Sequence, residues 1–379
     1  MNIKETPVLL LTGYLGSGKT TLLNRILANE KGIKFAVIVN DIGEVNIDAR
    51  LIEQGGIVAQ GDDNLVPLQN GCICCTLKMD LVQQLSDLAE GGRFDYIVIE
   101  ASGICEPAPI AQTISVYPRM YPEMAKSGKA KLDAIVTVCD ALRLRDEFAE
   151  GHDLQRDDLD EDDLASLVIQ QVEFCNMILL NKADEVTPDE LARIKAILHQ
   201  IQPQAEIIPC NYGDVDLDKI LNTHLFDFEK VATSARWIAA IEGEEDELEN
   251  EEEGEALEYG IGTFVYYRRR PFNLTEFDQL VAKHWPSSVI RCKGLCYFSN
   301  EKHLCYVFEQ SGKQFSLRNA GNWYATMPAD ELAEFKKQNP QVERDWDETY
   351  GDRMQKLVFI GQNMDREAIE AALDACLED

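Results

Sequence analysis

The chain has 379 residues, enough for two domains of ordinary size, and 45% of them are hydrophobic, which is ample for packed cores. Its formal net charge of −31 gives a surface that repels phosphate backbones, so we expect no nucleic-acid partner. No stretch approaches the roughly 20 apolar residues of a membrane span, so we expect no membrane partner either.

The N-terminus, MNIKETPVLLLTGYLGSGKTT, runs straight into a strand pattern and lacks the apolar segment of a cleavable signal peptide. We therefore expect a cytoplasmic protein. Its 11 cysteines then do not indicate a disulfide framework, because the cytosol keeps thiols reduced. Most of them are expected to pack as small buried hydrophobes.

Short apolar runs alternate with helical patterns over residues 1–228. The predicted strands are Pro7–Thr12, Phe35–Asn40, Tyr96–Ala101, Ala134–Cys139, Met177–Asn181 and Ala205–Pro209. The predicted helices between them include Lys19–Asn29, Lys78–Ala89, Asp163–Phe174 and Pro188–Gln200. This order predicts an α/β fold, a doubly wound and mostly parallel sheet that binds ligands at the carboxyl ends of its strands.

The stretch GYLGSGKT, residues 13–20, matches the P-loop pattern G-x-x-x-x-G-K-[ST] between a predicted strand and a predicted helix. Backbone N–H groups of such a loop surround a phosphate, and the helix N-terminus adds partial positive charge. Lys19 is expected to reach the β- and γ-phosphates as a catalytic residue, and Thr20 to hold Mg²⁺. The nucleotide-binding residues predicted here are Gly13, Gly16, Ser17, Gly18, Lys19, Thr20 and Thr21.

The segment NDIGEVNIDARLI, residues 40–52, follows the second predicted strand and is expected to be a switch loop. Two of its acids, Asp41 and Glu44, are candidate ligands for Mg²⁺ or for another metal. The alternative is that both side chains are solvated, and the sequence leaves this choice open.

The segment LQNGCICCTL, residues 68–77, places Cys72, Cys74 and Cys75 within four residues. Thiolates are soft ligands that Zn²⁺ favours, and three of them leave one tetrahedral position for a further ligand or a transfer partner. The alternatives are three packed thiols, or a redox pair formed by Cys72 and Cys75 in a C-x-x-C pattern. The intervening Cys74 and the P-loop context favour a zinc site.

The segment YIVIEASG, residues 96–103, ends a predicted strand at Glu100. An acid at this place can hold Mg²⁺ through water, and the N–H of Gly103 can sense a γ-phosphate. Glu100 and Gly103 are therefore predicted to act in catalysis.

The segment MILLNKAD ends a predicted strand with Asn181, Lys182 and Asp184, an N-K-x-D pattern. A carboxylate beside guanine accepts hydrogen bonds from N1–H and the exocyclic amine, a donor pair that adenine lacks. Lys182 can lie along the base plane. We predict GTP rather than ATP as the nucleotide; the alternative is an ordinary charged loop.

Residues 242–258 contain 11 acids and no bases, which predicts a solvated linker. The expected domains are a GTPase domain at 1–228, the acidic linker at 229–258 and a smaller α+β domain at 259–379. That last domain is expected to hold strands near 260–272, 296–300, 303–310 and 313–318, a helix at 274–285, and a final strand and helix. Arg268, Arg269 and Arg270 are expected to form a solvated strand end, with the acidic linker or a client as alternative partners.

Three further cysteines lie in this distal region, at Cys292, Cys296 and Cys305. Their spacing is compatible with a second metal site. The alternation through LCYVF favours side chains packed on a sheet. Cys105, beside Gly103, is likewise expected to be packed, with a role as a fourth thiol for zinc as the alternative.

The chain resembles the CobW family of P-loop GTPases, which are relatives of the GTPases that mature urease and hydrogenase. The matching stretches are GYLGSGKTT, NDIGEVNIDA, LQNGCICCTL, IEASG and NKAD, in the family's order, with RCKGLCYF and GDRMQKLVFIG in the distal domain. The resemblance implies a slow GTPase that carries zinc, with cobalt as an alternative metal, to a client metalloenzyme. The chain differs from many members of that family in having only 5 histidines and in carrying Asp41 at a position where Glu is commoner.

Other interpretations stay open at this point. One is a GTP-binding metal or redox sensor without delivery. Another is a cobalt or iron insertase that serves cobalamin synthesis or nitrile hydratase. A kinase-like P-loop enzyme is disfavoured by the N-K-x-D pattern. The sequence does not identify the client, the oligomeric state or the residue that positions the attacking water.

Overall fold

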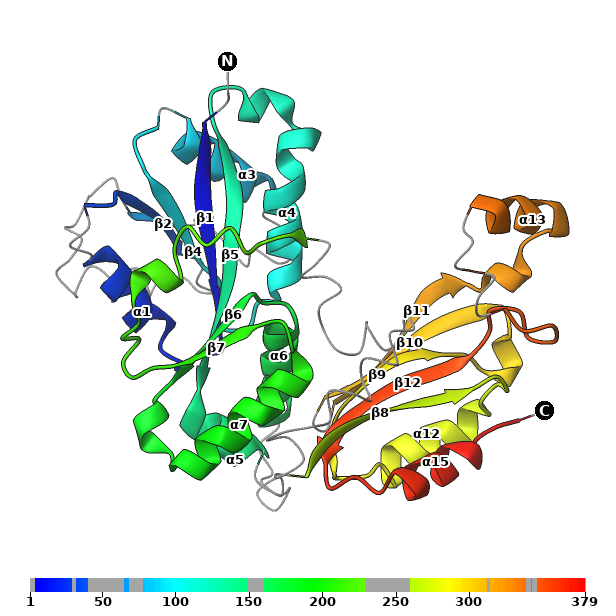
Figure 1. The fold of residues 1–379 in the computed structure, drawn as a ribbon. Helices are drawn as coiled ribbons and strands as arrows, with labels where there is room; N and C mark the ends of the chain where they lie inside the picture. The colour runs from blue at the N-terminus through cyan, green and yellow to red at the C-terminus, as the bar shows by residue number, and fades with distance from the viewer. Residues whose placement is uncertain are drawn as a thin grey trace. The chain divides into compact units, whose positions relative to one another are not determined.

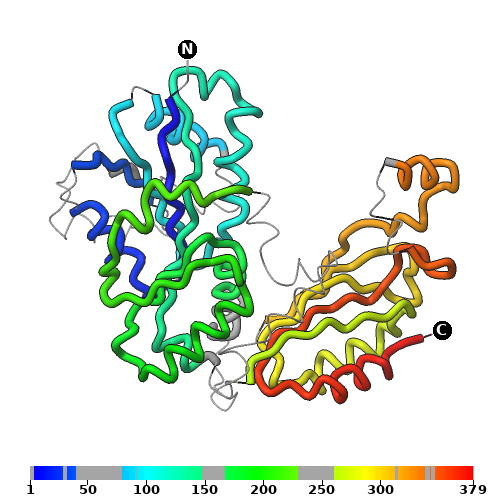
Figure 2. The backbone as a smooth tube through the Cα atoms, viewed as in Figure 1, coloured from blue at the N-terminus to red at the C-terminus, as the bar shows by residue number. Residues whose placement is uncertain are grey.

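A computed structural model of the chain describes ten stretches of residues. These are 4–28, 32–39, 65–67, 78–90, 92–148, 160–228, 260–311, 314–338, 342 and 346–378. The chain divides into two compact units, with residues 4–148 and 167–228 in the first and 260–378 in the second. Figures 1 and 2 show the chain as a ribbon and as a tube, coloured from the N-terminus to the C-terminus.

Several predicted site residues lie outside the described residues. They are Asp41 and Glu44 of the expected switch loop and Cys72, Cys74 and Cys75 of the cysteine loop. The acidic segment 242–258 is outside as well, so the predicted boundaries of the linker stay predictions.

The first unit contains a sheet whose seven described strands lie in the order β3-β2-β4-β1-β5-β6-β7. Their bounds are β1 Glu5–Thr12, β2 Phe35–Val39, β3 Leu65–Pro67, β4 Tyr96–Glu100, β5 Lys129–Asp140, β6 Met177–Asn181 and β7 Glu206–Pro209. Every pairing among these strands is parallel. This confirms the predicted doubly wound parallel sheet.

Helices cover both faces of this sheet. Their bounds are α1 Lys19–Leu27, α3 Lys78–Ala89, α4 Pro107–Met120, α5 Ala141–Phe148, α6 Asp160–Glu173 and α7 Pro188–Ile201. Leu9 and Leu11 of β1 pack in one core cluster with α1. Val8 and Leu10 point to the opposite face by strand alternation and are equally buried, so that face needs a covering layer too.

Two differences from the predicted strands have simple causes. β3 was not predicted, because three residues are too short to show a periodic pattern. β5 begins at Lys129 rather than at Ala134, because its first residues pair with Glu5–Val8 at the start of β1. Their charged side chains hide that extension in the sequence.

The second unit is an antiparallel sheet in the order β11-β10-β9-β12-β8, which confirms the predicted α+β domain. Its strands are β8 Ile261–Arg268, β9 Val289–Cys296, β10 Leu304–Ser311, β11 Gln314–Asn322 and β12 Gln355–Gln362. Its helices are α12 Leu274–Lys283, α13 Ala329–Gln338 and α15 Arg366–Asp374. Figure 1 shows α12 and α15 together along one face of the sheet, where Phe277 and Ile369 join its core.

One strand of the second unit was predicted in the wrong place. Residues 296–300 were expected to form a strand, whereas β9 ends at Cys296. β9 contains Arg291, Lys293 and Gly294, which break the hydrophobic alternation that predicts strands. The glycine is needed there, because a methyl group at Gly294 would lie 2.0 Å from the carbonyl oxygen of Lys356.

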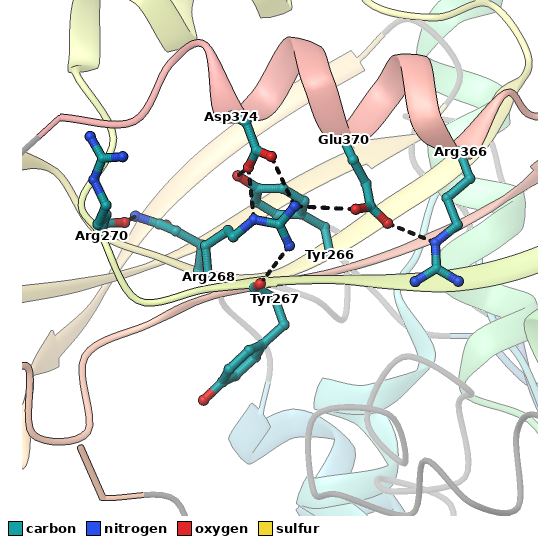
Figure 3. A network of polar contacts seen from close by, with 8 residues as sticks. Tyr266, Tyr267, Arg268, Arg270, Arg366, Glu370 and Asp374 are labelled. Carbon is teal, nitrogen blue, oxygen red and sulfur yellow. Dashed lines mark hydrogen bonds and ion pairs between the residues drawn. The ribbon is translucent and has the colours of Figure 1, made fainter.

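Arg268 links β8 to the last helix, as Figure 3 shows. It donates to Asp374 at 2.8 and 2.9 Å and to Glu370 at 3.2 Å. Tyr266 adds a bond to Asp374 at 2.9 Å. Arg269 donates instead to the carbonyl oxygen of Gly351 at 3.1 Å. The expectation of a solvated strand end is therefore wrong for Arg268 and Arg269.

The distal cysteines are packed side chains. Cys292 and Cys296 belong to the main core of the second unit, and Cys305 to a smaller cluster with Trp323. Burial raises the pKa of all three thiols, that of Cys305 to about 12. Among the described residues no group of His, Cys, Asp and Glu is arranged to hold a metal ion, which favours the packing interpretation. No described helix is long and apolar enough to cross a membrane.

Candidate nucleotide-binding site

The predicted motifs of the first unit meet at one edge of its sheet. β1 lies between β4 and β5, and the register pairs Leu11 with Glu100, Thr12 with Thr137, and Asp140 with Asn181. β1 and β4 therefore end at nearly the same level, and β5 and β6 end together three residues further along, at the same edge of the sheet. In doubly wound sheets, ligands bind in the crevice outside such carboxyl ends.

The loop after β1 has the backbone geometry of a phosphate cradle. Gly13, Gly16 and Gly18 all have positive φ angles, and α1 begins directly after them at Lys19. A methyl group at Gly13 would lie 2.3 Å from the carbonyl oxygen of Val138, and one at Gly18 would lie 2.3 Å from Nδ2 of Asn181. Both positions need glycine for space as well as for conformation. The loop is thus held close to β5 and β6.

Lys19 and Thr20 lie at the start of α1 beside this loop. The Lys19 side chain is buried, and its Nζ donates to the carbonyl oxygen of Tyr14 at 3.1 Å. The Thr20 hydroxyl donates to Oε1 of Glu100 at 3.0 Å. Glu100 ends β4 and is only 1% exposed. A hydroxyl and a carboxylate this close form the hard-oxygen donor set that Mg²⁺ prefers, so the residues present fit that ion.

The segment between β4 and α4 lies against the phosphate loop. A methyl group at Gly103 would be 2.8 Å from the backbone nitrogen of Leu15. Gly103 therefore allows the two backbone segments to approach each other. Cys105, in the same segment, is fully buried, as the packing interpretation predicts.

Asn181 joins the N-K-x-D segment to the phosphate loop. Its Nδ2 donates to the carbonyl oxygen of Ser17 at 2.9 Å, and its Oδ1 accepts from the N–H of Gly213 at 3.1 Å. Asp184 is exposed, and its backbone N–H donates to Asn211 at 3.0 Å. Both polar groups of the Asn181 side chain therefore bond to the protein backbone, while the carboxylate of Asp184 faces solvent and is accessible to a base.

Asp140, which the sequence prediction missed, connects both ends of the site. Its carboxylate forms an ion pair with Lys182, which has a left-handed backbone with φ 56°. Its backbone N–H donates to the hydroxyl of Tyr14 at 2.9 Å, and its carbonyl oxygen accepts from that hydroxyl at 3.1 Å. Burial raises the pKa of Tyr14, so the phenol keeps the proton it donates. The sequence feature that could have identified Asp140 is its place directly after the predicted buried strand AIVTVC.

The structure brings together most of the predicted residues that it describes. At this one edge, on strand ends, loops or helix starts, lie Gly13, Gly16, Ser17, Gly18, Lys19, Thr20, Glu100, Gly103, Asn181, Lys182 and Asp184. Thr21 is exposed on α1. The zinc ligands and the switch-loop acids stay outside the described residues.

Both units match known protein families. Residues 7–209 match the CobW/HypB/UreG nucleotide-binding domain, and residues 261–377 match the cobalamin synthesis protein cobW C-terminal domain. The chain belongs to the CobW/HypB/UreG family. This agrees with the resemblance drawn from the sequence motifs.

Relatives of this CobW/HypB/UreG chain include zinc-regulated GTPase metalloprotein activator 1 of Dictyostelium discoideum, 38% identical over 99% of the chain and 80% of the relative. The zinc chaperone CobW of Pseudomonas aeruginosa is 32% identical over 58% of the chain and 60% of the relative. The zinc chaperone YjiA of Escherichia coli is 27% identical over 96% of both. The crystal structure of Zn(II)-bound YjiA GTPase aligns over 100% of both chains at 22% identity, with a TM-score of 0.41. Such a TM-score is too low to compare the sites of two chains.

Proposed function

We propose that this protein hydrolyses GTP slowly and uses the cycle to bind zinc and deliver it to a client metalloprotein. The observation that carries the proposal is the meeting of the phosphate loop, the Thr20–Glu100 pair and the N-K-x-D segment at one sheet edge. The relative that is 38% identical over 99% of the chain is named a zinc-regulated GTPase metalloprotein activator, which supports the choice of metal.

The phosphate chemistry follows from the contacts of the loop. Backbone N–H groups of residues 13–18 and the N-terminus of α1 would hold the phosphates. The Lys19 ammonium would exchange its bond to the Tyr14 carbonyl for bonds to phosphate oxygens. Thr20 and Glu100 would hold Mg²⁺, which supplies positive charge opposite the phosphate oxygens. The N–H of Gly103 would donate to a γ-phosphate oxygen, a contact that GDP cannot offer.

The preference for guanine would come from the N-K-x-D segment. The exposed carboxylate of Asp184 would accept hydrogen bonds from the base. Lys182, held by Asp140, would lie along the base plane. Because Asn181 bonds to the Ser17 carbonyl, the base end and the phosphate end of the site are fixed to one another.

The zinc ligands in this proposal are Cys72, Cys74 and Cys75. They lie in the chain between the predicted switch loop and the Glu100–Gly103 segment, so a change at the γ-phosphate can alter the thiol geometry. If zinc binds better in one nucleotide state, that nucleotide binds better to the zinc-loaded protein, by thermodynamic linkage. Hydrolysis would then release the metal.

A zinc competition titration against a chromophoric chelator tests the proposal. It is run on reduced protein without nucleotide, with GDP and with a non-hydrolysable GTP analogue. The matched variant replaces Cys72, Cys74 and Cys75 with serine, and a control replaces the packed Cys292, Cys296 and Cys305. We expect binding that needs the first three thiols and changes with the nucleotide. Equal zinc affinity in all three states would rule out GTP-gated delivery.

A further inference from the structure

Gln171 of α6 holds the segment that contains Gly103. Its side chain is fully buried. Its Nε2 donates to the carbonyl oxygens of Gly103, at 3.3 Å, and Cys105, at 3.1 Å. The direction of the amide is certain on chemical grounds, because a reversed amide would place its oxygen against two carbonyl oxygens. One side chain thus bonds to both sides of the turn at residue 104.

The position of Gln171 is itself tied to β1 and β5. The Thr137 hydroxyl donates to the Gln171 backbone carbonyl at 3.0 Å and lies 2.8 Å from the Thr12 hydroxyl. Since Thr137 has one hydroxyl proton and uses it on Gln171, Thr12 is the donor to Thr137. Thr12 is the last residue of β1, directly before the phosphate loop. A buried chain of hydrogen bonds therefore runs from the start of that loop through Gln171 to Gly103.

The amide of Gln171 serves this position as a donor. Both of its N–H groups meet carbonyl oxygens of residues 103–105, while its Oε1 is buried without a hydrogen-bond partner among the described residues. A buried acceptor left unsatisfied costs stability. Two donated bonds are what a glutamine adds here beyond the packing that an apolar side chain of similar size would give, and these bonds set the place of the Gly103 backbone.

We propose that Gln171 is a positioning residue that holds the 103–105 segment ready for the γ-phosphate and so sets the preference for GTP over GDP. The inference rests on the proposed contact between Gly103 and the γ-phosphate, and it does not depend on zinc. GDP has no γ-phosphate, so its affinity should depend much less than that of GTP on where residues 103–105 lie.

The test compares affinities for a fluorescent non-hydrolysable GTP analogue and for fluorescent GDP. Loss of two neutral hydrogen bonds in Gln171→Leu is expected to weaken binding of the GTP analogue about tenfold and to leave GDP binding within about twofold. Gln171→Met, which keeps the length of the side chain, is expected to show the same change in the ratio. Circular dichroism and thermal melts check that each variant is folded.

The matched control is Gln202→Leu. Gln202 is also fully buried in the first unit, and its Nε2 donates to the carbonyl oxygen of Glu173 at 2.7 Å, away from the 103–105 segment. It should leave the ratio of the two affinities unchanged. An equal loss for both nucleotides in the Gln171 variants, or an unchanged ratio, would overturn the inference.

The variant Gly103→Ala distinguishes failure of the proposed γ-phosphate contact from failure of the proposed role of Gln171. The added methyl group would press on the Leu15 backbone of the phosphate loop, so it should weaken binding of both nucleotides, and of the GTP analogue by more, because it also displaces the proposed γ-phosphate contact. If Gly103→Ala leaves the ratio unchanged, the γ-phosphate contact is wrong, and the role of Gln171 falls with it. If Gly103→Ala changes the ratio but Gln171→Leu does not, only the role of Gln171 is wrong. The zinc titration tests delivery independently of both outcomes.

Discussion

The two units of this chain use charged side chains in opposite ways. In the first, Lys19, Glu100 and Lys182 lie at the ends of strands or the starts of helices, and each has a partner at the same edge of the sheet. In the second, Arg268 bonds to α15, and Lys293 and Arg318 both pair with Glu309 inside the sheet. The role of a charged side chain therefore depends on where it lies in the fold. Charged groups at the open edge of the sheet can exchange a protein partner for a ligand, whereas those between packed elements hold these elements together.

The sharpest test of the first half of this comparison is Lys19→Ala. If the Lys19 ammonium leaves the Tyr14 carbonyl for the phosphates, its removal takes away charge stabilisation that develops during hydrolysis, and we expect GTP hydrolysis to fall by at least about a hundredfold. Phosphate release measures the rate. The control is Lys129→Ala, which removes a surface ion pair with Glu5 in the same unit. A fall of less than about tenfold would show that Lys19 is not part of the catalytic site.

A middle-sized effect is expected for Asp140→Ala. The variant leaves Lys182 without its ion pair and keeps the backbone bonds to Tyr14. We expect affinity for GTP to fall about tenfold, with ATP binding little changed, because Lys182 would no longer be held beside the base. Competition with labelled GTP measures both. Asp146→Ala, on the exposed face of α5, is the control. If GTP and ATP binding weakened alike, Asp140 would serve only the phosphate loop.

The smallest effect is expected in the second unit. Arg268→Ala removes the bonds to Asp374 and Glu370 shown in Figure 3, and since the Arg268 side chain is 34% exposed we expect a loss of about 1 kcal/mol in unfolding free energy. GTP hydrolysis should not change. Urea unfolding monitored by tryptophan fluorescence measures the loss, with Lys302→Ala, an exposed cation of the same unit, as the control.

The same interaction has a predictable pH dependence. Partial burial by itself would raise the pKa of Asp374, but the bonds from Arg268 and Tyr266 outweigh it and lower that pKa. Stability from a carboxyl group with a lowered pKa is present above its ordinary pKa and is lost as the pH falls through the folded-state value. The difference between wild type and Arg268→Ala should therefore shrink below about pH 4. A difference that stays constant down to unfolding would mean that Arg268 acts through packing alone.

Much of the site was predictable because its motifs are local in the sequence. GYLGSGKT and NKAD each lie within eight residues that follow a buried strand, so one pattern defines both the residues and their place at the sheet edge. Asp140 could have been included, because it too follows a buried run. The helix α4 is harder to predict, since its 14 residues contain three prolines, and only the first of them stands where a helix tolerates proline well.

The sequence by itself determined the nucleotide-binding motifs, most of the order of strands and helices and the presence of three thiols in four residues, because those depend on residue types at short, regular spacing. Only the tertiary structure decided which distant residues meet. Gln171 lies 68 residues from Gly103, and Lys182 lies 42 residues from Asp140. No local pattern encodes such pairs, since they arise from the parallel register of β1, β4, β5 and β6 and from the helices packed against that sheet. The same packing turned Arg268 from an expected solvated ion into a link between β8 and α15.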